Sequence, residues 1–226
     1  ASVSELEEEI PHVQSIAGLL AWIKNMARIK PEGEWIIHPK FFPTRLAEMR
    51  QPTLAELDEV APANPVFLNG TYGGMINSEA MRQSAITAGT THPGIISDRT
   101  TGLPTGFIKV SEFSLLNLPP AKKITFKIRE EALREMFKRY NNYGITSVCF
   151  GFDDAATIAV YKNMRKNNKL TVRILQNILL PAIPGGITSR KVADILKGLG
   201  FSTGDGDEWE RKGPLKILID GGILTA

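Results

Sequence analysis

The chain has 226 residues, of which 42% are hydrophobic and 23% are charged, and its formal net charge is +3. This composition supports a folded core and excludes a disordered chain. The basic residues are scattered among acidic ones, so we expect no nucleic-acid partner. No stretch approaches the roughly 20 apolar residues that cross a membrane, and the acidic N-terminus has no hydrophobic signal segment. We therefore expect a cytoplasmic protein with no membrane partner.

The first part of the chain predicts an irregular mixture of helices and strands. Apolar residues recur there at helical spacing, and a threonine followed three residues later by a glutamate forms a capping-box pattern. In chain order, we expect a helix over 12–28, a short strand within 31–39, a helix within 51–62 capped by Thr53 and Glu56, a strand over 64–70, a helix over 76–86 that begins at Asn77 or Ser78, and two strands joined by a Gly/Pro turn over 94–110.

The second part of the chain alternates helices and strands. The expected elements are a helix over 125–144 ended by Gly144, a strand over 145–152, a helix over 153–168 opened by Asp153, a strand over 170–183, a helix over 188–201 and a strand over 215–220. This alternation is typical of a parallel sheet with right-handed crossovers, so the expected fold class is α/β. Pro119-Pro120 marks the expected boundary between a mixed α+β region, residues 1–120, and a βαβαβ region, residues 121–226.

The last predicted strand contains a lysine, Lys216, in the stretch GPLKILIDGG. Alternation puts Lys216 and Asp220 on one face, and a lysine inside a sheet needs a charged partner or a change in its own chemistry. Asp220 closes the strand at its carboxyl end, where α/β folds gather ligands and catalytic groups. The alternative is that Lys216 reaches solvent at a sheet edge and Asp220 caps a turn.

The histidines and the cysteine give little indication of a metal site. His12, His38 and His92 are isolated in the sequence, so each is expected on the surface or in a loop, with His92 in a turn. Neither the histidines nor the single cysteine form a metal-ligand motif. Cys149 lies in the apolar stretch TSVCFGF and is expected to be a packed core thiol.

Two glycine-rich stretches could bind ligands but have simpler explanations. Residues 69–79, NGTYGGMINSE, place backbone amides at the start of a helix, where an anion could bind, but they lack the spacing of a nucleotide-binding loop. A tight turn explains them better. Residues 204–213, GDGDEWERKG, do not fit a calcium-binding loop, so we expect a solvated loop there.

Several stretches, in order along the chain, resemble the amidohydrolase-3 family, a branch of the metal-dependent amidohydrolase superfamily. They include GEWII, ELDEVAPANPVFLNGTYGGMINSEAM, GLPTGFI, YNNYGITSV, GDGDEW and GPLKILIDGG. The resemblance implies a metal-dependent hydrolase that acts on C–N bonds of amide or imide type and folds as a TIM-like barrel. The chain would then be a partial TIM-barrel-like segment of parallel βαβ units, with an irregular mixed α+β insertion subdomain.

The resemblance also implies a metal centre. The lysine of GPLKILIDGG occupies the place of a carboxylated lysine that bridges metal ions on the fourth barrel strand, so Lys216 is the expected metal ligand. We further expect Asp220 to be a catalytic residue beside it, and Tyr72 and Asn77 to contact substrate. A divalent metal, zinc, is the implied cofactor of the complete enzyme, and its implied partner is a small-molecule substrate.

The sequence departs from the family pattern at the other metal ligands. The His-x-His of the first barrel strand, the later histidines and the aspartate that complete the metal centre have no counterpart here. We therefore expect a segment of a longer enzyme that is inactive in isolation and holds no metal by itself. The alternative is a non-catalytic ligand-binding or regulatory module of the same family. Unpaired sheet edges lead us to expect a homo-oligomer.

Overall fold

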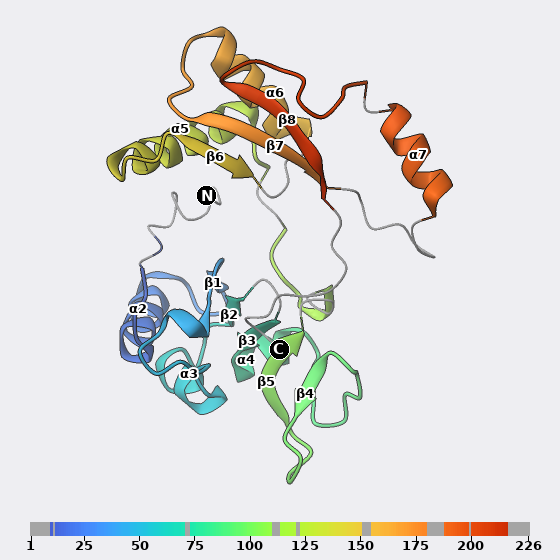
Figure 1. Cartoon of the computed structure of the whole chain (residues 1–226). Coiled ribbons are helices and arrows are strands. Elements are labelled where there is room, and N and C mark those ends of the chain that lie inside the picture. Colours follow the sequence, from blue (N-terminus) through green and yellow to red (C-terminus); the bar gives the residue numbers. More distant parts are fainter. Residues whose placement is uncertain are drawn as a thin grey trace. The chain divides into compact units, whose positions relative to one another are not determined.

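The computed structural model describes residues 10, 12–70, 73–109, 114–120, 123–150, 155–179, 188–198 and 200–216. These residues form two compact units. We call the described residues up to 120 the N-terminal unit and those from 123 onward the C-terminal unit (Figure 1). Within these ranges, no helix has the length and apolar character needed to cross a membrane.

A mixed five-stranded sheet lies at the centre of the N-terminal unit, with the strand order β1-β2-β3-β5-β4. β1 and β2 are parallel, whereas the other neighbours are antiparallel. The strands are β1 (Ile36–His38), β2 (Val66–Asn69), β3 (Gly73–Ile76), β4 (Ile95–Ser97) and β5 (Pro104–Lys109). This part of the chain does mix helices and strands, as the sequence predicts.

The helices of the N-terminal unit follow the predicted pattern. They are α2 (Ile16–Ile29), the 3-10 helix η1 (Pro43–Arg45), α3 (Leu54–Val60) and α4 (Ser78–Gln83). The capping box predicted for α3 is confirmed. The Thr53 hydroxyl accepts a hydrogen bond from the Glu56 amide at 3.2 Å, and the Glu56 carboxylate accepts one from the Thr53 amide at 2.7 Å.

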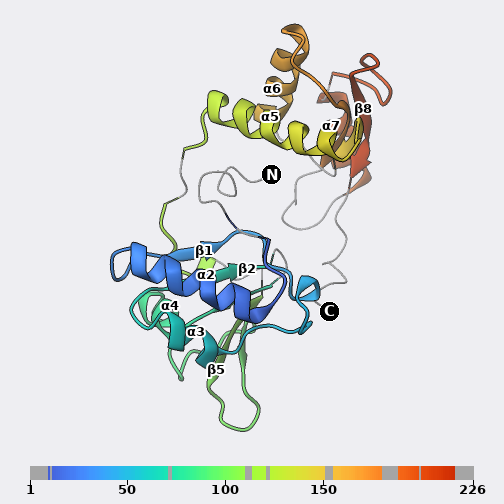
Figure 2. The ribbon, with the colours of Figure 1, turned by 90° about the vertical axis from the view of Figure 1, so that its left-hand side faces the viewer.

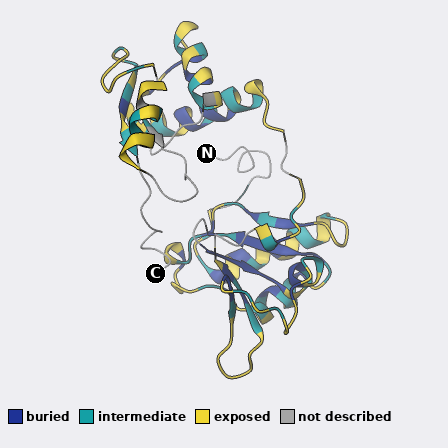
Figure 3. Cartoon of the chain, turned by 90° about the vertical axis from the view of Figure 1, so that its right-hand side faces the viewer, coloured by how far each residue is buried: buried dark blue, intermediate teal, exposed yellow. Residues whose placement is uncertain are grey.

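β2 is buried on both faces because helices cover each side of the sheet. Val66 and Leu68 pack with α2 and α3 in one hydrophobic cluster, whereas Phe67 packs with α4 in another. Figure 2 shows α2 in front of β1 and β2, and Figure 3 shows the buried residues gathered in the strands. A strand covered on both sides is apolar throughout, which explains the continuous apolar run of β2.

The strand β3 departs from the prediction, which placed a glycine-rich turn and the start of a helix over 69–79. Position 73 lies in β3, next to β5. A side chain at this position would collide with the Phe107 ring on β5, which explains the glycine. A glycine inside a strand often marks such a close approach. The glycines that permit the contact also remove the alternating pattern by which a strand is recognised in a sequence.

Asn77 joins β2, the end of α3 and the start of α4. Its Oδ1 accepts hydrogen bonds from the amides of Val66 at 2.8 Å and Ala80 at 3.0 Å. Its Nδ2 donates to the carbonyls of Ala61 and Asn64, both at 2.9 Å. These four bonds use the ordinary hydrogen-bonding capacity of the amide. The prediction that Asn77 caps the helix is confirmed, and the side chain also ties the helix to the sheet.

Three parallel strands, in the order β6-β7-β8, form the sheet of the C-terminal unit. The elements of this unit are α5 (Phe126–Asn142), β6 (Ser147–Phe150), α6 (Ala155–Lys166), β7 (Arg173–Leu179), α7 (Ser189–Gly198) and β8 (Glu210–Lys216). The predicted alternation and the parallel sheet are confirmed. Gly144, just after α5, has φ +72°, as expected for a glycine that ends a helix. Membership of these strands in a TIM-like barrel stays a prediction.

Helices α5 and α6 cover one face of this sheet. Val148 and Ile174 point to that side and pack in a cluster with Leu133, Met136, Phe137, Val160, Tyr161 and Met164. We call the opposite side the open face; it carries the exposed residues Ser147, Cys149, Arg173 and Arg211. The described part of the chain therefore covers the sheet on one side.

Replacement of Asn77 by alanine tests how far the N-terminal unit depends on this amide. The variant leaves buried backbone groups without partners, so we expect a loss of about 2–4 kcal/mol in the free energy of unfolding. Urea unfolding followed by circular dichroism measures it. The matched control is Asn25→Ala at an exposed position of α2, expected within about 0.5 kcal/mol of the parent chain. Equal effects of the two substitutions would contradict the assigned role.

Glu56 makes the stability of the N-terminal unit depend on pH. The hydrogen bonds from the Arg50 guanidinium, followed by that from the Thr53 amide, lower the pKa of Glu56 from 4.5 to about 2. Because the folded pKa is depressed, the stabilisation is present above pH 4.5 and is lost as the pH falls towards 2.

The variant Glu56→Gln tests this dependence. We expect it to unfold at lower urea concentration than the parent chain at pH 7, and we expect the difference to shrink steadily as the pH is lowered through this window. Glu59→Gln, at an exposed position of the same helix, is the control and should show no such trend. A difference that is independent of pH would contradict the prediction.

Candidate functional site

Lys216 lies at the carboxyl end of the described part of β8. It pairs with position 179, which is the last described residue of β7. Its side chain is partly buried. Ligands and catalytic groups gather at the carboxyl edge of parallel α/β sheets. The position is compatible with the role expected for Lys216, and that role stays a prediction.

A second lysine of β8, Lys212, lies on the opposite face from Lys216. Lys212 pairs with Gln176, which lies on the helix-covered side together with Ile174. Lys216 pairs with position 179, three residues further along β7. Positions three apart on a strand point to opposite faces. Lys216 is therefore on the open face, and Lys212 is on the face beneath the helices.

Lys212 has a charged partner on its own strand. Its ammonium donates to Oε1 of Gln176 and, at 3.1 Å, to Oε1 of Glu210, and Gln176 Nε2 donates to the same Glu210 oxygen at 3.2 Å. Gln176 is fully buried, and the side chains of Lys212 and Glu210 are both 11% exposed. A buried charge pair is tolerated when further hydrogen bonds satisfy it, as Gln176 does here. Sequence analysis missed this cluster because its members become neighbours only through strand pairing.

The loop before β8 is more ordered than the solvated loop predicted over 204–213. β8 begins at Glu210, so the last four residues of that stretch belong to the strand. Asp207 accepts hydrogen bonds from the amides of Trp209 at 2.8 Å and Glu210 at 3.0 Å, and from Arg165 Nε at 2.9 Å. The Glu210 and Trp209 amides, followed by the Arg165 guanidinium, lower the pKa of Asp207 to about 2. The aspartate thus anchors the loop to α6.

A hollow of about 260 Å³ lies between α6 and this loop. Its lining contains three cations and three anions, together with an aromatic ring: Lys162, Arg165, Phe201, Asp205, Gly206, Asp207, Glu210 and Lys212. Most of the charges are paired with one another. Its lining includes residues from the amino end of β8, away from Lys216. Because most of its charges are already paired, we assign the hollow no ligand.

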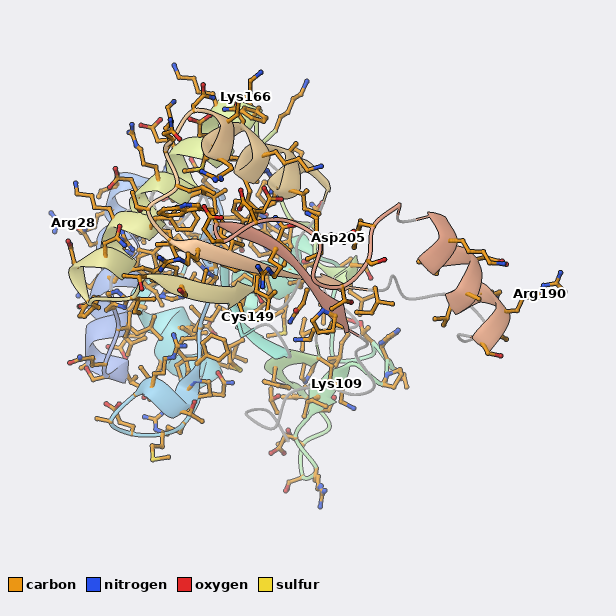
Figure 4. The ribbon with its side chains drawn as sticks, turned by 45° about the horizontal axis from the view of Figure 1, so that its top comes forward. Arg28, Lys109, Cys149, Lys166, Arg190 and Asp205 are labelled. Atoms are coloured by element: carbon orange, nitrogen blue, oxygen red, sulfur yellow. The ribbon has the colours of Figure 1, made fainter. Side chains whose placement is uncertain are left out.

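Cys149 corrects the prediction of a packed core thiol. It is exposed on the open face of β6, which lies at one edge of the described sheet (Figure 4). The neighbouring Val148 and Phe150 point to the helices and pack in the core. The residues on either side of Cys149 are apolar because they face the helices, whereas Cys149 faces the opposite side of the strand.

The histidines do not form a metal site with other described residues. His38 is buried in β1, which corrects the expectation of a surface or loop position, and its ring lies edge-on to Trp22 and Phe41. His92 is in a turn, as predicted, where its Nδ1 accepts from the Gly94 amide at 3.2 Å. Across the described ranges, no group of three His, Cys, Asp or Glu side chains is placed to hold a metal ion.

The remaining predicted site residues are Asp220, Tyr72 and Asn77. Asp220 and Tyr72 lie outside the described residues, so their roles stay predictions. Asn77 is fully buried, and its amide is occupied by the four hydrogen bonds of the N-terminal unit. Contact between substrate and Asn77 would require some of these bonds to break.

Comparison with known proteins assigns the chain to a family. A model of the amidohydrolase family matches residues 1–226. The chain belongs to the amidohydrolase family. The resemblance that GPLKILIDGG and the other stretches indicate is confirmed.

The amidohydrolase chain is similar to an N-substituted formamide deformylase of Arthrobacter pascens, with 28% identity over 173 residues. That match covers 74% of this chain and 32% of the relative, so the chain spans about a third of the relative's length. Two solved structures, titled as uncharacterized metal-dependent hydrolases, come from Pyrococcus horikoshii OT3 and Pyrococcus furiosus. Their TM-scores are 0.49 and 0.47, each at 17% identity, covering 97% of this chain and 41% and 42% of those chains.

The exposure of Cys149 gives a simple test of the open face of the amidohydrolase chain. A thiol-specific reagent should modify Cys149 in native buffer at a rate close to that of the chain unfolded in urea, because the reagent already reaches the exposed thiol in the folded chain. Absorbance of the released chromophore measures the rate, and Cys149→Ser is the blank. A reaction that needs urea would show that the thiol is packed.

Proposed function

We propose that this chain contributes Lys216 to the metal centre of a hydrolase that cleaves the C–N bond of a small amide. One observation carries the proposal. In a chain matched along its length by the amidohydrolase family, a lysine lies late in a parallel strand, on the face that the described helices leave open. The carboxyl end of such a strand is the edge at which a substrate could approach the chemistry.

The proposed role of Lys216 is to hold the metal as a carbamate. Carboxylation replaces the ammonium with an anionic group whose oxygens suit a divalent cation. When bound, the metal supplies Lewis acidity and a nucleophile at neutral pH. Asp220, four residues beyond Lys216, is proposed to accept and return the proton that hydrolysis moves. Tyr72 remains a proposed substrate contact.

The described donor set fits this metal only in part. Lys216 has the right place, but the described residues provide no cluster of further ligands around it. We propose that the remaining ligands come from residues outside the described part of the protein. Residues 1–226 expressed alone should then hold no stoichiometric metal and hydrolyse no amide.

N-substituted formamides are the first substrates to test. The name of the Arthrobacter relative suggests them, and the likeness covers about a third of that enzyme. Hydrolysis of such a compound breaks the bond between the formyl carbon and nitrogen and releases formate and an amine.

The test uses the complete open reading frame, expressed with zinc and bicarbonate. We expect formate release from an N-substituted formamide. We expect Lys216→Met to lower both activity and zinc content by about 100-fold, at the upper end of effects seen at metal-site residues. Lys197→Met, at an exposed position of α7, is the matched control and should behave as the parent protein.

Two outcomes would count against the proposal. A Lys216→Met variant that keeps full zinc content would exclude the lysine from the metal centre. A zinc-loaded complete protein that hydrolyses no amide, imide or formamide would favour the non-catalytic module instead.

A further inference from the structure

The strand β8 contains one more residue than its partner β7 over the same length. Gln176 pairs with Lys212, but Ile178 pairs with Leu215, so two steps along β7 correspond to three along β8. The extra residue falls at Gly213-Pro214, opposite Asn177. This is the pattern of a β-bulge, a device that turns the side chains beyond it to the other face.

The bulge decides which face Lys216 occupies. In a regular strand, residues four apart point to the same side, so Lys212 and Lys216 would share a face. With the bulge between them, Lys212 lies beneath the helices, paired with Glu210, and Lys216 lies on the open face. Without the extra residue, Lys216 would point away from the side on which the metal site is proposed.

A side chain at position 213 would crowd β7 at the bulge. A Cβ there would collide with Oδ1 of Asn177 and would lie 3.0 Å from the Gln176 carbonyl oxygen. Gly213 is buried, so the strand has no open space on that side. Pro214 has no N–H to offer a strand ladder, and proline within sheets is confined to edges and bulges.

Asn177 fills the space that Gly213 leaves. Its Nδ2 donates to Sγ of Cys149 at 3.3 Å on the neighbouring strand. Its Oδ1 is buried against Gly213 and has no hydrogen-bond partner among the described residues. An amide in this position is costly for stability, which points to a role beyond packing.

We propose that Gly213 and Asn177 are positioning residues that hold a one-residue bulge in β8 and thereby place Lys216 on the open face. This inference rests on the proposed function for its purpose, but the geometry can be tested without metal. The two lysines of β8 serve as reporters, because they lie on opposite faces of the strand.

The test measures acetylation of the two lysines by mass spectrometry of the native chain. In the parent chain, Lys212 should react slowly, because its ammonium is paired with Glu210 and its side chain is only 11% exposed, and the rate of Lys216 relative to it is the reference ratio. Gly213→Ala should lower the ratio of the two rates by about tenfold, the lower range of effects seen when a supporting contact is lost. Gly198→Ala is the matched control, since a side chain there would meet open space, and it should leave the ratio unchanged.

A double variant separates positioning from loss of folding. Asn177→Gly removes the group with which the new Cβ collides, so the double variant Gly213→Ala/Asn177→Gly should recover the ratio to within about threefold of the parent chain. Circular dichroism reports whether each variant folds. A folded Gly213→Ala variant with an unchanged ratio, or a folded double variant without recovery, would overturn the inference.

The complete protein shows whether the bulge matters for the metal. Zinc content should fall in Gly213→Ala and recover in the double variant. If Lys216→Met leaves zinc content unchanged, the proposed function fails while the acetylation result still stands. If Lys216→Met abolishes zinc binding and Gly213→Ala does not alter it, the proposed function stands and the bulge has no positioning role.

Discussion

The C-terminal unit depends on one strand holding two lysines on opposite faces. The side chain of Lys212 is 11% exposed, and its ammonium is bonded to Glu210 and to the buried Gln176 within the sheet. Removing one member of such a cluster leaves an uncompensated buried group, which is far more destabilising than replacing the whole cluster by apolar residues. The cluster therefore specifies how β8 pairs with β7 more than it adds stability. Once that pairing is set at Gln176, the bulge sets the face of every later residue of β8.

The two ends of the described strand β8 differ in the contacts that they make. At the amino end, Asp207 ties the loop to α6 and the Lys212 cluster fixes the register of the strand. At the carboxyl end, Lys216 emerges on the open face. A reacting group must be held by a rigid support to act reproducibly, and the support here lies on the same strand. The proposed function predicts such a separation, because strands of a TIM barrel carry stability at one end and chemistry at the other.

Local interactions could be predicted from the sequence, and long-range ones could not. The capping box at Thr53, the cap at Asn77 and the glycine after α5 each depend on residues a few positions apart. By contrast, the exposure of Cys149 and the burial of His38 depend on what covers each strand. The strand β3 was not predicted because its glycines interrupt the alternating pattern of apolar residues. One of them, Gly73, leaves room for the Phe107 ring. For the candidate site, sequence gave the identity of Lys216 and its alternation with its neighbours, whereas its face relative to Lys212 depends on a register shift.

The sequence did contain a signal for that shift. Glycine followed by proline inside an apolar strand is unfavourable unless the strand bulges there. The strand also holds a second lysine, Lys212, whose charged partner is Glu210. The ammonium of Lys212 is bonded to Glu210 and Gln176 beneath the helices, whereas Lys216 stands on the other face of the same strand. One extra residue in β8 therefore separates a lysine held by the sheet from the lysine that the proposed function assigns to the metal.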